Sequence, residues 1–335
     1  MRAAIITEPG TITLGQRPDP TPAPDGVVLR VGACGICGTD LHIADGEFPP
    51  SPYPLVPGHE FAGEVVEAGG NAPGGLRPGD RVAVDPSLFC GYCTYCRAGR
   101  GNLCANWGAV GDTVDGAFAE YVAVPAANCY RIPDSLTMRE GALAEPLSCA
   151  VHGVRRVGVE AGERFLLFGA GTMGLLLQQL LQNAGAEVTM VDRIPERLAI
   201  AAELGAKHTA VDIAQIDGEF DAAADATGAP AAIEAAFTAL RRGGRLLVFG
   251  VAAEDARVSL SPFRIYNDEI TVVGSMAVLH SFGTAVDLLG SGTLRTAPLL
   301  SHALPLESFP EALQLMRSGV GVKIQVTPDG TETGA

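Results

Sequence analysis

Residues 164–174 read RFLLFGAGTMG, and this stretch decides the fold of the second half of the chain. The apolar run at 164–169 is typical of a buried strand, and the uncharged segment from Gly171 to about Ala184 predicts a helix after it. A GxGxxG pattern between a strand and a helix is typical of dinucleotide-binding domains. Its glycines permit a tight turn and a close approach of the pyrophosphate, and the helix N-terminus supplies amide donors for phosphate.

An acidic residue stands where such a domain needs one, at the end of the next predicted strand, 187–192. Asp192 can accept hydrogen bonds from both adenosine ribose hydroxyls and would repel a 2′-phosphate, so it predicts NAD rather than NADP. We expect the Arg193 guanidinium to lie on the adenine face, although an arginine there could also meet a 2′-phosphate. The predicted cofactor-binding residues are Gly169, Gly171, Thr172, Met173, Gly174, Asp192, Arg193 and Arg197.

Strands and helices alternate on both sides of this motif, whereas the first third of the chain holds short β-rich runs between prolines and glycines. The alternation predicts a parallel, doubly wound α/β sheet of the Rossmann type, and the first third predicts an irregular antiparallel β domain. Residues 282–289 and 309–317 look helical and 323–326 strand-like, and we expect this end to pack back onto the first domain. The other predicted strands are 27–31, 64–67, 81–84, 120–124, 208–212, 221–225, 245–251 and 269–275, and the other predicted helices are 195–204 and 231–240.

Cysteines in the β-rich part form two different patterns. Cys90, Cys93, Cys96 and Cys104 lie in FCGYCTYCRAGRGNLC (89–104), with overlapping spacings that fit zinc better than disulfides or a single redox dithiol. An all-cysteine site leaves no open coordination position, so it predicts a structural zinc.

A second set combines three ligand types. Cys37 lies in GICGTDLH (35–42), and His59 and Glu60 lie in PGHEFAGEV (57–65). A thiolate, an imidazole and a carboxylate can bind zinc and still leave a position for water or substrate. A closed zinc site together with an open one indicates a metal-assisted enzyme.

Composition excludes several classes of partner. The chain has 335 residues, 47% of them hydrophobic, and a formal net charge of −15. Nucleic acid and anionic membranes need a cationic surface, so neither is expected as a partner. Metal-binding thiols must stay reduced, so we expect a soluble, cytoplasmic protein.

These pieces, in their order and spacing, resemble the zinc-dependent medium-chain dehydrogenase/reductase family across nearly the whole chain, and most of all its polyol branch of sorbitol, xylitol, arabinitol and butanediol dehydrogenases. The resemblance implies a GroES-like β-rich catalytic domain at 1–147 with a structural zinc lobe at 90–104, an NAD-binding Rossmann domain at 148–280, and a return segment at 281–335 that completes the catalytic domain. The motifs are GICGTDLH (35–42), PGHEFAGEVVEAG (57–69), LRPGDRV (76–82), the cysteine lobe, DGAFAEYV (115–122), EPLSCAVHG (145–153) and GAGTMG (169–174).

The resemblance also implies roles for single residues. Cys37 and His59 would bind the catalytic zinc, with Glu60 as a third, exchangeable ligand. Glu145 would lie next to the metal and bind it or its water, and which of the two glutamates is a ligand at rest stays open. Thr39 would contact the substrate oxygen and start a proton relay that ends at His42 near solvent. The implied reaction is hydride transfer from a secondary alcohol or polyol to NAD, with two zinc ions per chain.

One departure bears on the substrate. Sorbitol dehydrogenases usually carry an aromatic–arginine–aromatic element where this chain reads GSMAVLH (274–280). The missing arginine favours a shorter polyol, a diol or a less polar secondary alcohol.

Alternatives remain within and outside this reaction class. They are a threonine-type or simple alcohol dehydrogenase, a zinc-free NADPH quinone or enone reductase, and a non-catalytic NAD(H)-binding regulator. Activity and metal content would separate them. An exposed strand edge near 269–275 predicts a homodimer or homotetramer.

Overall fold

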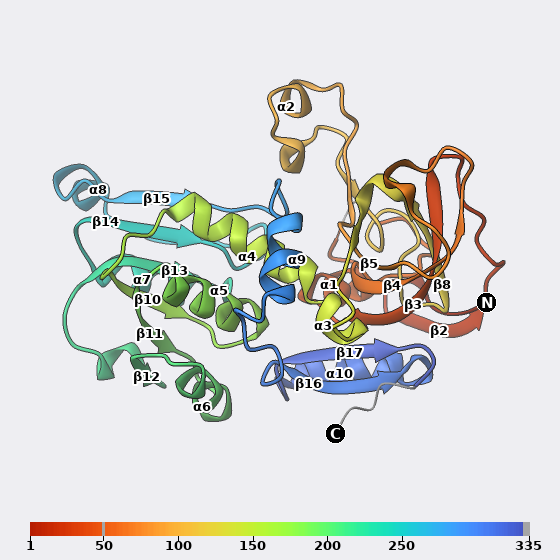
Figure 1. Cartoon of the computed structure of the whole chain (residues 1–335). Coiled ribbons are helices and arrows are strands. Elements are labelled where there is room, and N and C mark those ends of the chain that lie inside the picture. The colour runs from red at the N-terminus through yellow and green to blue at the C-terminus, as the bar shows by residue number, and fades with distance from the viewer. Residues whose placement is uncertain (49–50, 331–335) are drawn as a thin grey trace. The chain divides into compact units, whose positions relative to one another are not determined.

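The computed structural model describes residues 1–48 and 51–330 and divides the chain into two compact units (Figure 1). Unit 1 comprises residues 1–148 and 278–335, and unit 2 comprises residues 149–277. The boundary falls inside helix α4 (Ala144–Val157). Within the described part of the chain, helices are too short or too polar to cross a membrane.

Unit 2 is built on a six-stranded parallel sheet with the order β12-β11-β10-β13-β14-β15. The order reverses at β10, the strand that precedes the glycine motif, because β11 pairs with one edge of β10 and β13 with the other. This is the doubly wound order of dinucleotide-binding folds, so the predicted Rossmann class is confirmed. The strands are β10 (Arg164–Phe168), β11 (Glu187–Val191), β12 (His208–Ala210), β13 (Phe220–Asp225), β14 (Leu240–Val248) and β15 (Thr271–Gly274).

Helices connect these strands, and several begin with a proline in the first turn, where its missing N–H costs nothing. One apolar core of the unit lies between α7 and the strands β10, β13 and β14, and includes Ile233, Phe237 and Leu246. The helices are α5 (Thr172–Asn183), α6 (Pro195–Glu203), α7 (Pro230–Thr238) and α8 (Pro262–Asn267), with a 3₁₀ turn η4 (Ile213–Gln215).

Unit 1 contains a mainly antiparallel sheet of seven strands with the order β16-β17-β3-β4-β5-β9, and β8 also pairs with β3. The last strand, β17, pairs with β3 through Gln325 with Gly35 and Val326 with Cys34. The C-terminal segment therefore pairs with the N-terminal part of the chain in one sheet. The strands are β3 (Gly26–Gly35), β4 (Glu60–Ala68), β5 (Arg81–Val84), β8 (Tyr121–Pro125), β9 (Cys129–Arg131), β16 (Leu300–Pro305) and β17 (Lys323–Thr327).

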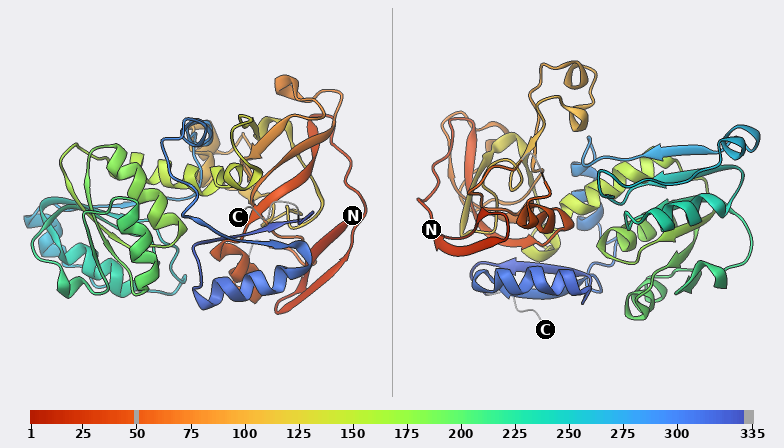
Figure 2. Two further views of the ribbon diagram at one scale, coloured as in Figure 1. Left: turned by 60° about the horizontal axis from the view of Figure 1, so that its bottom comes forward. Right: turned by 180° about the vertical axis from the view of Figure 1, so that it is seen from behind.

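Two two-stranded sheets and several short helices complete unit 1. Figure 2 shows α10 alongside β16 and β17, where Phe309, Ala312 and Leu313 are buried. The two-stranded sheets pair β1 (Arg2–Glu8) with β2 (Thr11–Gln16) and β6 (Ser87–Leu88) with β7 (Gly108–Ala109). The helices are α1 (Gly38–Asp45), α2 (Thr94–Arg97), α3 (Met138–Gly141), α9 (Phe282–Gly290) and α10 (Phe309–Ser318), and the 3₁₀ turns are η1 (Pro73–Gly75), η2 (Gly101–Leu103), η3 (Ala126–Asn128) and η5 (Leu306–Ser308).

Some element boundaries differ from those predicted. The helix predicted at 231–240 ends at Thr238, and the strand predicted at 245–251 already begins at Leu240. Leu240 pairs with Phe220 across a register shift in the ladder between β13 and β14. This early start depends on a tertiary partner, which periodicity along the chain does not reveal.

Candidate active site and metal centres

The mixed ligand set converges where two paired strands of unit 1 meet. Cys37 follows β3 and is the N-cap of α1, while Glu60 begins β4 and pairs with Gly35 of β3. The ligand atoms of Cys37, His59 and Glu60 all lie within 4.8 Å of one another. A Cβ at Gly35 would overlap the Glu60 carboxylate, so only glycine leaves that side chain its place.

Lys323 of strand β17 contacts this ligand set. Lys323 Nζ forms an ion pair with Glu60 Oε2 and donates a hydrogen bond to the Ile36 carbonyl at 2.9 Å. Both side chains are buried, with Lys323 3% and Glu60 1% exposed. Burial alone would lower the pKa of Lys323, but the charges of Glu60 and Cys37 outweigh it and raise this pKa.

Two buried aspartates face the His59 ring. His59 Nδ1 lies 3.0 Å from Asp112 Oδ1 and 3.8 Å from Asp40 Oδ1. Burial raises the pKa of Asp40 to about 7. Burial also disfavours the charged His59 ring, but the nearby Asp112 charge raises the His59 pKa well above its ordinary value. With Nδ1 turned toward Asp112, Nε2 is the ring nitrogen left for a metal, as in carboxylate–histidine–zinc arrangements.

The two predicted relay residues lie on α1. Thr39 is partly buried, and its Oγ1 is 3.8 Å from Cys37 Sγ. His42 lies further along the helix with its side chain 45% exposed, and its Nδ1 is 2.8 Å from Glu47 Oε2. The helix therefore leads from the ligand set to the surface of unit 1.

Glu145 lies in the first turn of α4 and is partly buried. It lies outside the set of three ligands within 4.8 Å, but its charge also raises the Lys323 pKa. Of the two glutamates that sequence reasoning left open, the structure places Glu60 with Cys37 and His59.

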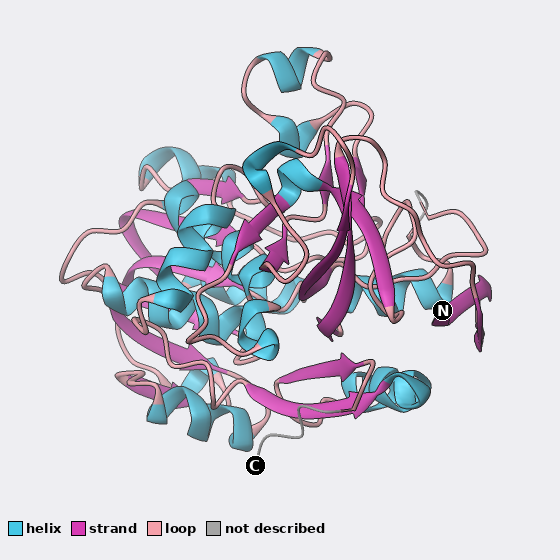
Figure 3. Ribbon diagram, turned by 45° about the vertical axis from the view of Figure 1, so that its right-hand side comes forward, coloured by secondary structure: helices cyan, strands magenta, loops and turns pink. Residues whose placement is uncertain are grey.

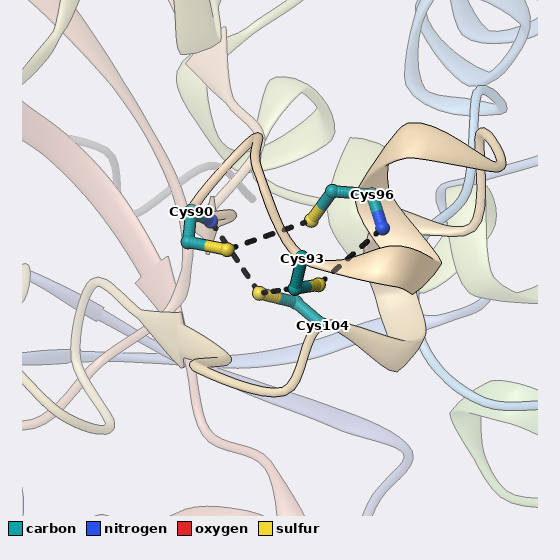
Figure 4. Close-up of side chains that lie close together, drawn as sticks. All are labelled: Cys90, Cys93, Cys96 and Cys104. Carbon is teal, nitrogen blue, oxygen red and sulfur yellow. Dashed lines mark hydrogen bonds between the residues drawn. The ribbon is translucent and has the colours of Figure 1, made fainter.

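The four-cysteine lobe, with η2 and α2, projects from the sheet of unit 1 (Figure 3). Its sulfur atoms point toward one another (Figure 4), and Cys90–Cys96 and Cys93–Cys104 are each separated by 4.0 Å. A disulfide needs about 2.05 Å. A tetrahedron of thiolates at about 2.3 Å from zinc has edges of about 3.8 Å, so the lobe fits zinc.

The glycine motif of unit 2 has the geometry that phosphate binding needs. A Cβ at Gly174 would overlap the Gly169 carbonyl, so glycine is required for α5 to start this close to β10. Gly171 is the N-cap of α5 and makes no side-chain cap. Asp192 Oδ2 accepts a hydrogen bond from the Ala170 amide at 2.6 Å, which places this carboxylate beside the loop. Arg197 Nη1 also lies next to the loop, 3.9 Å from where a Cβ on Gly171 would stand.

Comparison with known proteins adds the family. Residues 23–134 match the alcohol dehydrogenase GroES-like domain, and residues 172–291 match the zinc-binding dehydrogenase family. D-arabinitol dehydrogenase 1 of Uromyces fabae is 40% identical, covering 91% of this chain and 90% of its own. D-altritol 5-dehydrogenase of Agrobacterium fabrum is 39% identical, covering 92% and 94%. The chain belongs to the zinc-binding alcohol dehydrogenase family.

Solved structures agree with this family. A zinc-binding dehydrogenase of Sinorhizobium meliloti 1021, bound to NADP, superposes with a TM-score of 0.93 at 35% identity, covering 98% of this chain and 99% of that one. An alcohol dehydrogenase of Escherichia coli CFT073, complexed with NADH, superposes with a TM-score of 0.91 at 29% identity, covering 98% of this chain and 99% of that one. The chain is therefore a zinc-using oxidoreductase, and the predicted family and GroES-like plus Rossmann class are confirmed.

Three charged residues at the mixed ligand set were not predicted from the sequence as site residues. Asp40 stands out only as part of a motif, and neither Asp112 nor Lys323 belongs to a recognisable ligand pattern. Asp112 precedes the DGAFAEYV motif, and Lys323 lies in the predicted return strand. The one signal for Lys323 is its rarity, since the chain has only two lysines, Lys207 and Lys323.

Proposed function

We propose that this dehydrogenase oxidises a secondary alcohol of the polyol class to a ketone, with NAD as the hydride acceptor. The observation that carries the proposal is the convergence of Cys37, His59 and Glu60 within 4.8 Å in a chain that also carries the glycine motif. Unit 1 would hold the metal and the substrate, and it corresponds to the catalytic domain proposed at 1–147 and 281–335. Unit 2 would hold the cofactor, and it corresponds to the NAD-binding domain proposed at 148–280.

The residues of unit 1 fit a catalytic zinc. Cys37, His59 and Glu60 would hold it, with Glu145 close by, and Cys90, Cys93, Cys96 and Cys104 would hold a structural zinc. A zinc ion bound to the mixed set would lower the pKa of an alcohol hydroxyl by acting as a Lewis acid. Asp112 would keep the His59 ring turned so that Nε2 remains available.

Thr39 and His42 would move the hydroxyl proton to solvent. Thr39 Oγ1 would accept the proton of the substrate while passing on its own, and the His42 imidazole would receive it. Glu47, 2.8 Å from His42 Nδ1, would hold that nitrogen protonated and leave Nε2 as the acceptor.

Replacing His42 by alanine is expected to lower turnover about 10²-fold at neutral pH, with partial recovery at alkaline pH or in added imidazole. The reason is that the proton would lose its acceptor while zinc and substrate binding stay intact. The measurement is the pH profile of kcat. An unchanged profile would remove His42 from the mechanism.

Asp192 supports NAD over NADP, although one related structure was solved with NADP. The test of the proposal is a panel of alcohols with each cofactor, from butanediol through four-, five- and six-carbon polyols to threonine. We expect faster rates with NAD and the best substrates among diols and short polyols, together with two zinc ions per chain. Equal use of NADP would contradict the role of Asp192. Activity on threonine alone would favour a threonine-type dehydrogenase. A lack of activity on every alcohol of the panel would favour a non-catalytic NAD(H)-binding regulator.

Homo-oligomers and a cytoplasmic location are parts of this proposal. Strand β15 is the last in its sheet, and Val272 on it is 42% exposed. On α8, Phe263 and Tyr266 are 68% and 83% exposed. Two copies could pair through this edge about a two-fold axis and cover these side chains. All eight cysteines lie within the described residues and none of them forms a disulfide, which suits a reducing compartment.

A further inference from the structure

The ion pair between Lys323 and Glu60 is unusual for this chain. Its basic residues are almost all arginines, yet one of its two lysines is 3% exposed and faces the ligand set. Lys207, the other lysine, pairs with Glu187 at the surface, where both side chains are more than half exposed. The Lys323 ammonium has lost its water, and the Ile36 carbonyl and Glu60 carboxylate replace part of that hydration.

The backbone fixes this cation in place. Lys323 begins β17, which is paired with β3 on one side and with β16 on the other. Two residues further along, Gln325 accepts a hydrogen bond from Arg139 at 3.1 Å and donates one to the Arg139 carbonyl at 2.8 Å. The strand that carries Lys323 is therefore held on both of its edges and through Gln325.

A buried cation beside the ligand set has two effects on the Glu60 carboxylate. Removing one partner of a buried ion pair is strongly destabilising because the other charge stays buried without compensation. A carboxylate held by an ammonium is also less available to a metal, because both cations compete for the same oxygen atoms.

We propose that Lys323 is a resident counter-cation for Glu60. It neutralises the carboxylate before zinc binds, so that the strands around Cys37, His59 and Glu60 fold without the catalytic zinc. It also competes with bound zinc for Glu60, which keeps this ligand exchangeable. The proposal rests on the proposed function through one assignment, that of Glu60 as a zinc ligand. Lys323 is a positioning residue and has no role in moving protons or hydride.

The experiment compares the full-length wild type with K323M, E60Q and E60Q/K323M, each zinc-loaded and metal-stripped. Zinc release to a chromophoric chelator and thermal unfolding are measured for each form. In K323M we expect zinc release from the mixed set to slow by about tenfold, because Glu60 then has no competing cation. The difference in Tm between its loaded and stripped forms should widen, because only the stripped form holds an uncompensated Glu60. In the E60Q background, adding K323M should change neither quantity appreciably.

Several controls separate the outcomes. Zinc release from the four-cysteine lobe serves as an internal reference, because its rate should be the same in all four proteins. K207M removes the other lysine, which forms an exposed ion pair, and it should behave as wild type. K323Q keeps a hydrogen-bond donor for the Ile36 carbonyl but removes the charge. It should reproduce the slower zinc release of K323M, and it replaces K323M in the experiment if that variant does not fold. Cobalt substitution gives a spectroscopic readout, because permanent Glu60 ligation in K323M should alter the d–d bands.

Equal destabilisation of loaded and stripped K323M with unchanged zinc release would overturn the proposal and leave Lys323 a purely structural ion pair. The same slowing by K323M in the wild-type and E60Q backgrounds would also overturn it, because the effect would then not pass through Glu60. Failure of the zinc assignment on which the proposal rests would look different, since the wild type itself would then bind one zinc per chain. Failure of the substrate assignment would change the rates on the alcohol panel and leave both readouts of this experiment as they are.

Discussion

Alanine in place of His59 is expected to abolish the catalytic zinc and to lower kcat/KM by at least about 10³-fold. His59 would bind zinc as a neutral imidazole, and its Nδ1 lies 3.0 Å from Asp112. Without the ring, a thiolate and a carboxylate already paired with Lys323 remain, and these hold zinc poorly. Losing a Lewis acid costs several kcal/mol of transition-state stabilisation, which corresponds to this loss of rate.

The measurement is zinc content per chain together with kcat/KM on the best alcohol of the panel. Zinc should fall from two ions per chain to one, because the lobe cysteines are untouched. H208A is the matched control, since His208 is exposed on β12 of unit 2 and should keep both zinc ions and full activity. An H59A protein with two zinc ions and unchanged kcat/KM would contradict the assignment of the mixed set.

Patterns that are local in sequence predicted the parts of the site that are local in space. The lobe cysteines fall within residues 90–104, and their spacing alone brings the sulfurs together. The β10–α5 turn follows from the glycine motif for the same reason. Cys37 and Glu60 are further apart, but they lie at the ends of β3 and β4, which pair directly.

Residues that depend on long-range packing could not be found in this way. Lys323 reaches Glu60 across 263 positions of sequence because β17 joins β3, and a short strand pattern near the C-terminus does not reveal which edge it pairs with. Asp112 reaches His59 from a turn between short strands, where an aspartate is ordinarily explained by turn chemistry. Charge partners inside a site are set by the tertiary fold, and only the ligands themselves carry a spacing signal.

Replacing Cys104 by serine is the second change with a large expected effect, and it should act on stability. Removing one thiolate leaves three sulfurs and an alcohol, which is a much weaker donor for zinc, so we expect lobe affinity for zinc to fall by at least about 10³-fold. The lobe has little apolar core of its own, since Tyr92 and Tyr95 are 65% and 46% exposed. We therefore expect its fold to depend on the metal.

The observable consequences are one zinc per chain, a lower Tm, and rapid proteolytic cleavage within residues 90–104. Catalytic zinc should remain, because Cys37 and His59 are not part of the lobe. C129S is the control: Cys129 is a free thiol outside both sets, and burial raises its pKa to about 12, so it is protonated at neutral pH. If C104S kept two zinc ions and an unaltered Tm, the lobe would be held by its own packing. The 4.0 Å sulfur separations would then reflect chain geometry and not a metal site.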